Sequence, residues 1–166
     1  MKNKKELITF DFGTGPVPAH RHKNPDGSMG GWVANTATVA DTAYIGEDAQ
    51  VYGHAKVFGN AKVADDAQVF GIAWVYDNAE VSDNAKVSGK ASVYGDTWVF
   101  GDAQVYGDTW VYDNAEVSDN AKVFGNAEVS GNAQVAGDAQ VSGNAKVFGD
   151  TWVAGNTKLS SGTYKE

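Results

Sequence analysis

Residues 57–87 read VFGNAKVADDAQVFGIAWVYDNAEVSDNAKV, and this stretch decides the fold. An aliphatic residue stands at every sixth position, and an alanine or threonine stands two positions before it. A Gly or Asp followed by an Asn or Asp comes after most of the short apolar segments. The same pattern runs without insertion or deletion from Val33 to Leu159, which makes twenty-two hexads. A six-residue period does not match the 3.6-residue turn of an α-helix, so the stretch is not helical.

Alternation within each hexad indicates short strands. The alanine and the aliphatic residue point to one side of a strand, and their two neighbours point to the other. The Gly–Asn or Asp–Asn pair tolerates left-handed backbone conformations and turns a corner. Three strands and three corners close a triangular coil of eighteen residues, and coils stack about 4.8 Å apart. The pattern therefore predicts an all-β, left-handed parallel β-helix of about seven coils.

A longer internal repeat supports this coil length. The segment AWVYDNAEVSDNAKV at 73–87 recurs as TWVYDNAEVSDNAKV at 109–123, at an offset of 36 residues. This offset equals two coils, so each residue of the duplicated segment stays on the same face. A right-handed β-helix would not impose a strict six-residue period.

The repeat also divides the chain into three parts. We expect an N-terminal cap and lead-in over 1–32, the β-helix over 33–159 and a C-terminal tail over 160–166. The alternating segment at 7–12, which contains ITFDF, is expected to lie across the first coil. The last part, SSGTYKE, is expected to tail off the final coil.

The hexad pattern resembles the hexapeptide-repeat, left-handed β-helix superfamily. That superfamily includes acyltransferases, γ-class carbonic anhydrases and several non-catalytic members. The segment GGWVANTATVADTAYIGEDAQVYGHAKV at 30–57 also resembles poorly characterised bacterial and phage proteins of the superfamily. The resemblance implies the fold, whereas the repeat itself carries no chemistry.

Composition narrows the class of partner. The chain has no cysteine, which excludes disulfides and thiolate sites, and its net charge is −8. A surface this acidic argues against direct binding to nucleic acid or to an anionic membrane and favours basic partners. The N-terminus MKNKKELITFDF lacks a long apolar core, and no apolar run is long enough to span a bilayer. We therefore expect a cytoplasmic protein, either bacterial or phage-encoded.

Catalysis finds little support in the sequence. Catalytic members of the superfamily interrupt the repeat with extruded loops that supply a histidine, and nothing interrupts this repeat. The carbonic-anhydrase relatives bind zinc through three histidines, whereas here only His54 lies in a coil and His20 and His22 precede it. We expect no metal site and no cofactor. His54 is a weak catalytic candidate: an alternative hypothesis is an acyltransferase-like site between subunits near His54 and Lys90, but a tolerated corner residue is the preferred interpretation.

Outward-pointing residues make one face aromatic. We number the faces by their first hexads, so that the first begins at Val33, the second at Val39 and the third at Ile45. The second face is the aromatic face, with Phe58, Trp74, Tyr76, Tyr94, Trp110, Tyr112 and Phe148. These rings predict either a stacking ladder or an interface. We favour the interface, first for a homo-oligomer (dimer or trimer), second for a foreign partner and third for a sugar.

One corner of the prism concentrates negative charge. The corner that follows the third face carries Glu47, Asp48, Asp65, Asp66, Asp83, Asp102, Asp119 and Asp138, which we call the acidic ridge. Aspartate suits corners, so the ridge has a purely structural interpretation. A regular row of carboxylates also imitates a nucleic-acid backbone. By contrast, the corner after the first face holds His54, Ile72 and Lys90 in successive coils.

These observations favour a non-enzymatic, rigid protein-interaction module that is oligomeric. Its concrete version is a phage or bacterial decoy whose acidic ridge blocks a basic, nucleic-acid-binding protein. Its candidate binding residues are Phe58, Trp74, Tyr76, Tyr94, Trp110, Tyr112, Asp65, Asp66, Asp83, Asp102 and Asp119.

Overall fold

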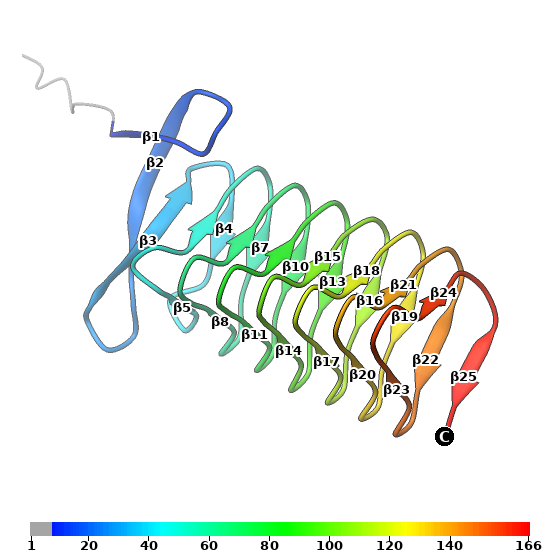
Figure 1. The fold of residues 1–166 in the computed structure, drawn as a ribbon. Coiled ribbons are helices and arrows are strands. Elements are labelled where there is room, and N and C mark those ends of the chain that lie inside the picture. Colours follow the sequence, from blue (N-terminus) through cyan, green and yellow to red (C-terminus); the bar gives the residue numbers. More distant parts are fainter. Residues whose placement is uncertain (1–7) are drawn as a thin grey trace, which may run out of the picture.

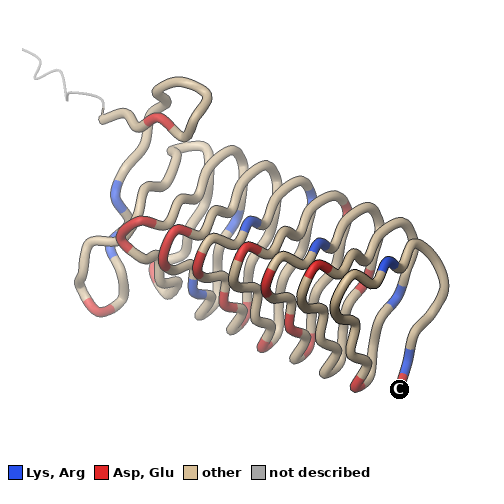
Figure 2. Tube along the Cα trace, in the orientation of Figure 1, with Lys and Arg blue, Asp and Glu red and all other residues tan. Residues whose placement is uncertain are grey.

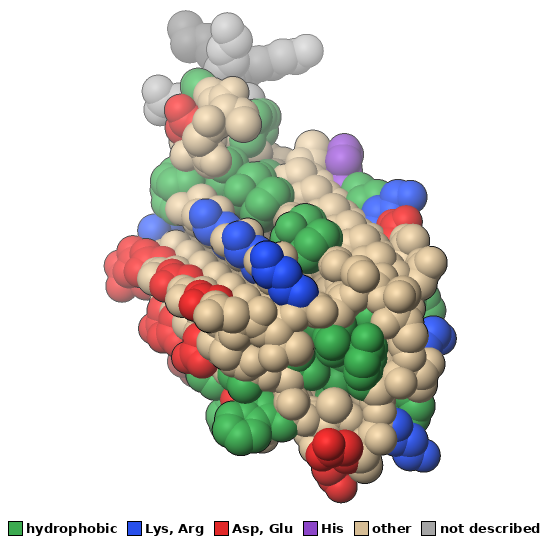
Figure 3. Space-filling model, turned by 45° about the vertical axis from the view of Figure 1, so that its right-hand side comes forward, with side chains coloured by type: hydrophobic (Ala, Val, Ile, Leu, Met, Phe, Trp, Pro, Cys, Tyr) green, Lys and Arg blue, Asp and Glu red, His purple; other side chains and the backbone are tan. Residues whose placement is uncertain are grey.

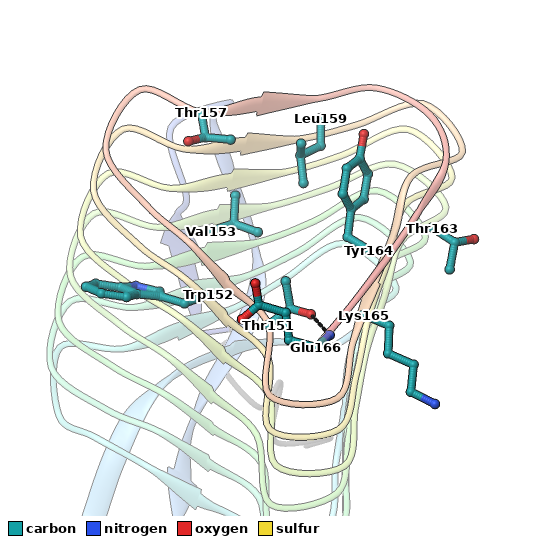
Figure 4. Close-up of a pocket in the computed structure, with 9 residues that line it drawn as sticks. All are labelled: Thr151, Trp152, Val153, Thr157, Leu159, Thr163, Tyr164, Lys165 and Glu166. Atoms are coloured by element: carbon teal, nitrogen blue, oxygen red, sulfur yellow. Dashed lines mark hydrogen bonds between the residues drawn. The ribbon is translucent and has the colours of Figure 1, made fainter.

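A computed structural model describes residues 8–166 as a three-sided parallel β-solenoid (Figure 1). Strands pair in parallel with strands eighteen residues further on, as Val75 does with Val93. Seen along the axis with the C-terminal coil in front, the chain passes clockwise from Trp152 through Leu159 to Thr163 (Figure 4), which is a left-handed winding. The predicted fold of about seven triangular coils is confirmed.

Each face of the prism is one sheet. The first face contains β1 (Thr9–Asp11), β2 (Pro16–Lys23), β3 (Met29–Ala34), β6 (Gln50–Val51), β9 (Gln68–Val69), β12 (Lys86–Val87), β15 (Gln104–Val105), β18 (Lys122–Val123), β21 (Gln140–Val141) and β24 (Lys158–Leu159). The second face contains β4 (Thr38–Val39), β7 (Lys56–Val57), β10 (Trp74–Val75), β13 (Ser92–Val93), β16 (Trp110–Val111), β19 (Glu128–Val129), β22 (Lys146–Phe148) and β25 (Thr163–Lys165). The third face contains β5 (Tyr44–Ile45), β8 (Lys62–Val63), β11 (Glu80–Val81), β14 (Trp98–Val99), β17 (Glu116–Val117), β20 (Gln134–Val135) and β23 (Trp152–Val153).

The core is a stack of alanine and valine side chains. The inward valines from Val51 to Val147 are fully buried, and so are nearly all the alanines between them. Burying one such valine stabilises the fold by about 1.5–3 kcal/mol. Backbone groups pair from coil to coil, as where the Trp74 amide donates to the Ala91 carbonyl at 2.9 Å. Neither interaction exists in an isolated hexad, so the coils stabilise one another.

Corners depend on the left-handed backbone conformation. The first corner residue is usually a glycine, as at Gly107 with φ +86°, but five corners use aspartate instead. Asp83 adopts φ +55° and its Oδ2 accepts a hydrogen bond of 3.0 Å from the Gly101 amide in the next coil. Short polar side chains of this kind tolerate the conformation because they bond locally.

The N-terminal segment caps the solenoid differently from the prediction. Instead of lying across the first coil, β1 pairs antiparallel with β2, and β2 pairs antiparallel with β3 (Figure 1). The eight residues of β2 can pair on both edges, so the hairpin extends the first face. Phe10 stacks on Trp32 at 4.7 Å, and Phe12 stacks on Tyr52 at 4.9 Å, which holds β1 against the outer surface of that sheet. Leu7, the first residue of the predicted cap segment, lies outside the described residues.

Two side chains of this hairpin satisfy the open edge of the third face. Asn24 accepts a hydrogen bond from the Ile45 amide at 2.8 Å and donates to the Ile45 carbonyl at 3.0 Å. His22 bonds through Nε2 to the Ala43 carbonyl at 3.0 Å. Both side chains therefore take the place of a preceding coil, and both residues are buried.

The C-terminal segment also differs from the prediction. Rather than tailing off, residues 163–165 form β25, which pairs in parallel with β22, so that Tyr164 aligns with Val147. Tyr164 thus occupies an inward position and packs on the core. Together with Val153 and Leu159 it lines a recess of about 410 Å³ at this end of the prism (Figure 4). Backbone pairing continues to this strand, because the Lys146 amide donates to the Gly162 carbonyl at 2.9 Å.

Residues 8–166 include no helix with the length and apolar character needed to cross a lipid bilayer.

Substitution at a corner tests how closely the coils approach. A Cβ atom at Gly107 would lie 2.7 Å from the Gly125 carbonyl oxygen, whereas one at Gly155 would meet nothing within 4 Å. We expect Gly107→Ala to lower the free energy of unfolding by about 3 kcal/mol, because overpacking adds to left-handed strain. Gly155→Ala introduces only the left-handed backbone strain, so it should lower the free energy of unfolding by about 1 kcal/mol. Equal losses in chemical denaturation would contradict close coil packing.

The cap makes a second prediction about stability. Asn24→Ala leaves the buried Ile45 amide and carbonyl unpaired, so the free energy of unfolding should fall by about 2–4 kcal/mol. Ser28→Ala is the control, because it removes one partner of Asn24 but leaves Ile45 paired. It should cost less than about 1 kcal/mol. Hydrogen exchange at the Ile45 amide should accelerate in Asn24→Ala and stay slow in the control.

Candidate functional site

Four rings of the aromatic face form a continuous stack, which we call the aromatic column: Phe58, Tyr76, Tyr94 and Tyr112. Phe58 and Tyr76 stack at 4.9 Å, Tyr76 and Tyr94 at 4.7 Å, and Tyr94 and Tyr112 at 5.1 Å, with interplanar angles of 5–7°. Parallel in-register strands align these rings, because each residue lies directly over the one eighteen positions before it. All four rings are half-buried by one another. The stacking ladder is therefore present, and its rings offer mainly their edges to a partner.

Two tryptophans beside this column remain exposed. Trp74 keeps 42% and Trp110 keeps 54% of its surface. Trp74 meets Phe58 edge-on at 72°, and Trp110 meets Tyr94 edge-on at 72°. The ammonium group of Lys56 lies over the Trp74 ring at 4.8 Å. These indoles are the largest exposed apolar groups of the aromatic face and its principal candidates for binding.

A shallow recess of about 530 Å³ adjoins Trp110. Asp108, Asn126 and Asn144 line it from the corner after the first face, and Glu128 and Lys146 line it from the second face. Aromatic surface beside convergent polar groups is typical of a small-molecule subsite.

Glu128 connects this recess to the aromatic column. Its carboxylate pairs with the Lys146 ammonium at 2.7 Å and accepts a hydrogen bond from the Tyr112 hydroxyl. Lys146 first and Tyr112 second lower the pKa of Glu128, so its carboxylate stays ionised. Burial, helped by neighbouring phenols and carboxylates, raises the pKa of Tyr94 to about 12.

The acidic ridge lies where the sequence placed it. Figure 2 shows acidic residues following one edge of the solenoid, and Figure 3 shows rows of acidic side chains with a row of basic side chains beside them. All eight ridge residues are exposed. In the sequence, the ridge corner is followed by the first-face strands, and three of these strands begin with a lysine: Lys86, Lys122 and Lys158.

Bonds to neighbouring coils fix several ridge carboxylates. Asp65 accepts from the Asp83 amide at 3.3 Å, and Asp119 accepts from the Gly137 amide at 2.9 Å. Asp102 accepts from the Asn84 side chain at 3.0 Å. The purely structural interpretation is thus partly supported, since these aspartates help to hold the corners. The same bonds also give the ridge a defined geometry.

The two candidate surfaces lie on opposite sides of the prism. The ridge occupies the corner between the third and first faces, and the aromatic face is the side facing away from that corner. One ligand of modest size therefore contacts one surface at a time, and the surfaces can be tested separately.

The three histidines serve different parts of the structure. His54 is exposed at its corner, and its backbone amide donates to the Gly71 carbonyl at 2.7 Å. His20 bonds to Asn35 at 2.9 Å, and His22 belongs to the cap. Residues 8–166 contain no group of three His, Cys, Asp or Glu side chains placed to hold a metal ion.

Sequence reasoning missed the polar surroundings of Trp110 and the capping role of Asn24. The polar surroundings of Trp110 could have been predicted from the sequence, because Glu128 and Lys146 follow Trp110 at steps of eighteen residues and so share its column. The capping role of Asn24 leaves no pattern in the sequence, since Asn24 lies outside the repeat and reaches Ile45 only because the hairpin folds back.

Comparison with known families supports the fold. Residues 139–155 match the family described as the YdcK beta solenoid repeat. Searches of curated proteins and of solved structures return no match. The matched segment is about one coil long. Together with the parallel solenoid of about seven turns, it fits the hexapeptide-repeat β-helix superfamily.

The tyrosine stack predicts a loss of stability at high pH. An unfolded phenol ionises near pH 10, whereas Tyr94 in the stack ionises near pH 12. Between these values the folded state binds more protons than the unfolded state, so stability falls as pH rises. Tyr94→Phe should flatten this decline when denaturation midpoints are measured from pH 10 to pH 12. An unchanged slope, with normal phenolate absorbance titration in the wild type, would contradict the prediction.

Proposed function

We propose that this β-solenoid repeat protein is a non-enzymatic, rigid interaction module whose acidic ridge binds a positively charged protein surface. The observation that carries the proposal is the fixed position of the ridge carboxylates. Asp65, Asp83 and Asp119 each reach an amide of the next coil, so their charges repeat in register with the backbone.

Fixed carboxylates bind more effectively than mobile ones. Ordering a flexible side chain at an interface costs about 0.5–1.5 kcal/mol, and this cost falls when the folded chain already holds the side chain. Successive ridge charges stand about 4.8 Å apart along the axis, because they follow the coil spacing. A straight, regularly spaced row of charge favours an equally regular row of cations and accelerates their association.

Few ridge carboxylates are neutralised by a direct ion pair, although a row of basic side chains lies beside the ridge (Figure 3). Residues 8–166 contain four ion pairs, and only the pair between Arg21 and Glu47, at 3.8 Å, includes a ridge residue. The remaining ridge carboxylates are open to a partner's cations. Surfaces with such a field attract oppositely charged partners over distances near the Debye length, which is about 8–10 Å in ordinary salt.

A nucleic-acid-binding protein is the partner class that best suits this ridge. Its basic groove accepts a regular line of anionic groups, and the ridge presents such a line on a stiff rod. In this decoy function the protein occupies the groove and excludes nucleic acid. A bacterial or phage-encoded cytoplasmic protein would meet such partners directly.

Neutralising the ridge tests the proposal. The variant Asp65→Asn, Asp83→Asn, Asp102→Asn and Asp119→Asn removes four charges, while asparagine keeps an acceptor oxygen and tolerates the left-handed conformation. Exposed ion pairs contribute about 0.2–1 kcal/mol each, so loss of four should weaken binding of an oligo-arginine peptide about fourfold or more. Fluorescence anisotropy measures this affinity, which should also fall with added salt.

The matched control lies at another corner. Asp77, Asp96, Asp113 and Asp150 follow the second face, and Asp77 and Asp113 share the left-handed conformation. Changing these four to asparagine alters net charge equally and should leave affinity within about twofold. Equal weakening by both variants would indicate attraction to overall charge and would rule out the ridge as the binding surface.

A further inference from the structure

We infer that the aromatic face is a binding site for an extended β-1,4-linked pyranose glycan, with Trp74 and Trp110 as stacking platforms. This site lies opposite the acidic ridge and does not depend on the function proposed for it. Three features carry the inference: the polar recess at Trp110, the common orientation of the two indoles and their spacing along the axis.

The recess at Trp110 has the chemistry of a sugar subsite. A pyranose ring has a face of C–H groups that packs on an indole and a rim of hydroxyls that needs donors and acceptors. Asp108 and Glu128 supply acceptors, Lys146 supplies a donor, and the amides of Asn126 and Asn144 supply both. Their recess of about 530 Å³ is open at the surface and has room for a saccharide.

The two indoles are turned the same way. Each meets a ring of the aromatic column at 72°, with centroid distances of 6.1 Å for Phe58–Trp74 and 6.4 Å for Tyr94–Trp110. The column rings are themselves parallel within 5–7°. These similar contacts give the two indoles similar orientations. The Lys56 ammonium lies over the Trp74 ring at 4.8 Å, so a sugar that stacks on that face of Trp74 displaces it, whereas the matching position before Trp110 is held by the small Ser92.

The spacing of the indoles suits an extended glycan. Trp74 and Trp110 lie two coils apart in one column, which is about 9.6 Å along the axis. Two residues of an extended β-1,4-linked chain cover a similar length, and every second residue presents the same ring face. Ser92 occupies the coil between the tryptophans, and its small side chain leaves the path from one indole to the other clear.

The polar surroundings favour a glycan over an apolar protein surface. Charged residues are depleted at the cores of protein interfaces. Here Asp108, Glu128 and Lys146 lie beside the exposed indole, where an apolar partner would have to desolvate them. A hydroxylated ligand instead exchanges their water for hydrogen bonds.

Titration with defined glycans tests the inference. Cellohexaose and chitohexaose are the probes, with the disaccharides of the same series, which are too short to reach both indoles, for comparison; tryptophan fluorescence and calorimetry report binding. At least one hexasaccharide should bind the wild type about tenfold more tightly than its disaccharide, because contact with one indole raises the effective concentration at the other. Trp110→Ala should abolish binding. Trp74→Ala should reduce the hexasaccharide to the affinity of the disaccharide.

Two controls separate the site from general effects. Trp98 on the third face is 57% exposed and lies outside the aromatic face, so Trp98→Ala should leave glycan affinity unchanged. The ridge variant with four asparagines should also bind glycan normally, which distinguishes failure here from failure of the ridge proposal. Thermal denaturation checks that each variant is folded.

Three results would overturn the inference. The first is no binding of either hexasaccharide at millimolar concentration. The second is equal loss of affinity in Trp98→Ala and Trp110→Ala. The third is a wild-type oligomer in light scattering that Trp74→Ala and Trp110→Ala dissociate while neither glycan binds, which would assign the aromatic face to a second copy of the chain.

Discussion

Pairing of each coil's backbone with the coil eighteen residues later is the constraint on which the rest of the structure depends. Hexads contain too little apolar surface to fold alone, so every strand needs neighbours above and below. A single inserted residue would turn valines outward and alanines into corners. Regular pairing also aligns side chains in columns, and both the aromatic column and the acidic ridge are direct results of that alignment.

Most of the fold was predictable because the same six-residue pattern recurs along most of the chain. The period identified the inward valines, the corners and the face of each outward residue. The two ends were predicted wrongly, since they depart from the period. Asn24 and His22 imitate a coil with side chains, and Tyr164 enters the core seventeen rather than eighteen residues after Val147. Such solutions depend on three-dimensional contacts that no repeat encodes.

The sequence predicted which residues form each candidate surface, but it did not predict their burial or their hydrogen bonds. The sequence placed Tyr94 in a column, whereas only the structure shows that stacking half-buries it and leaves Trp110 as the exposed group. It placed Asp83 at a corner, whereas its bond to Gly101 shows that the charge is held in place. Partner identity depends on the surface of another molecule, and that information is absent from this chain.

The direction of the hydrogen bonds between coils has a mechanical consequence. These bonds run along the axis of the rod, from Trp74 to Ala91 and onward. Bending is resisted by three sheets at once, so the rod is stiff when it is pushed sideways. Tension along the axis instead pulls on these bonds along their own direction, and the coil junctions then break one after another. Pulled from its ends, the solenoid should therefore lengthen in discrete steps, each releasing one eighteen-residue coil.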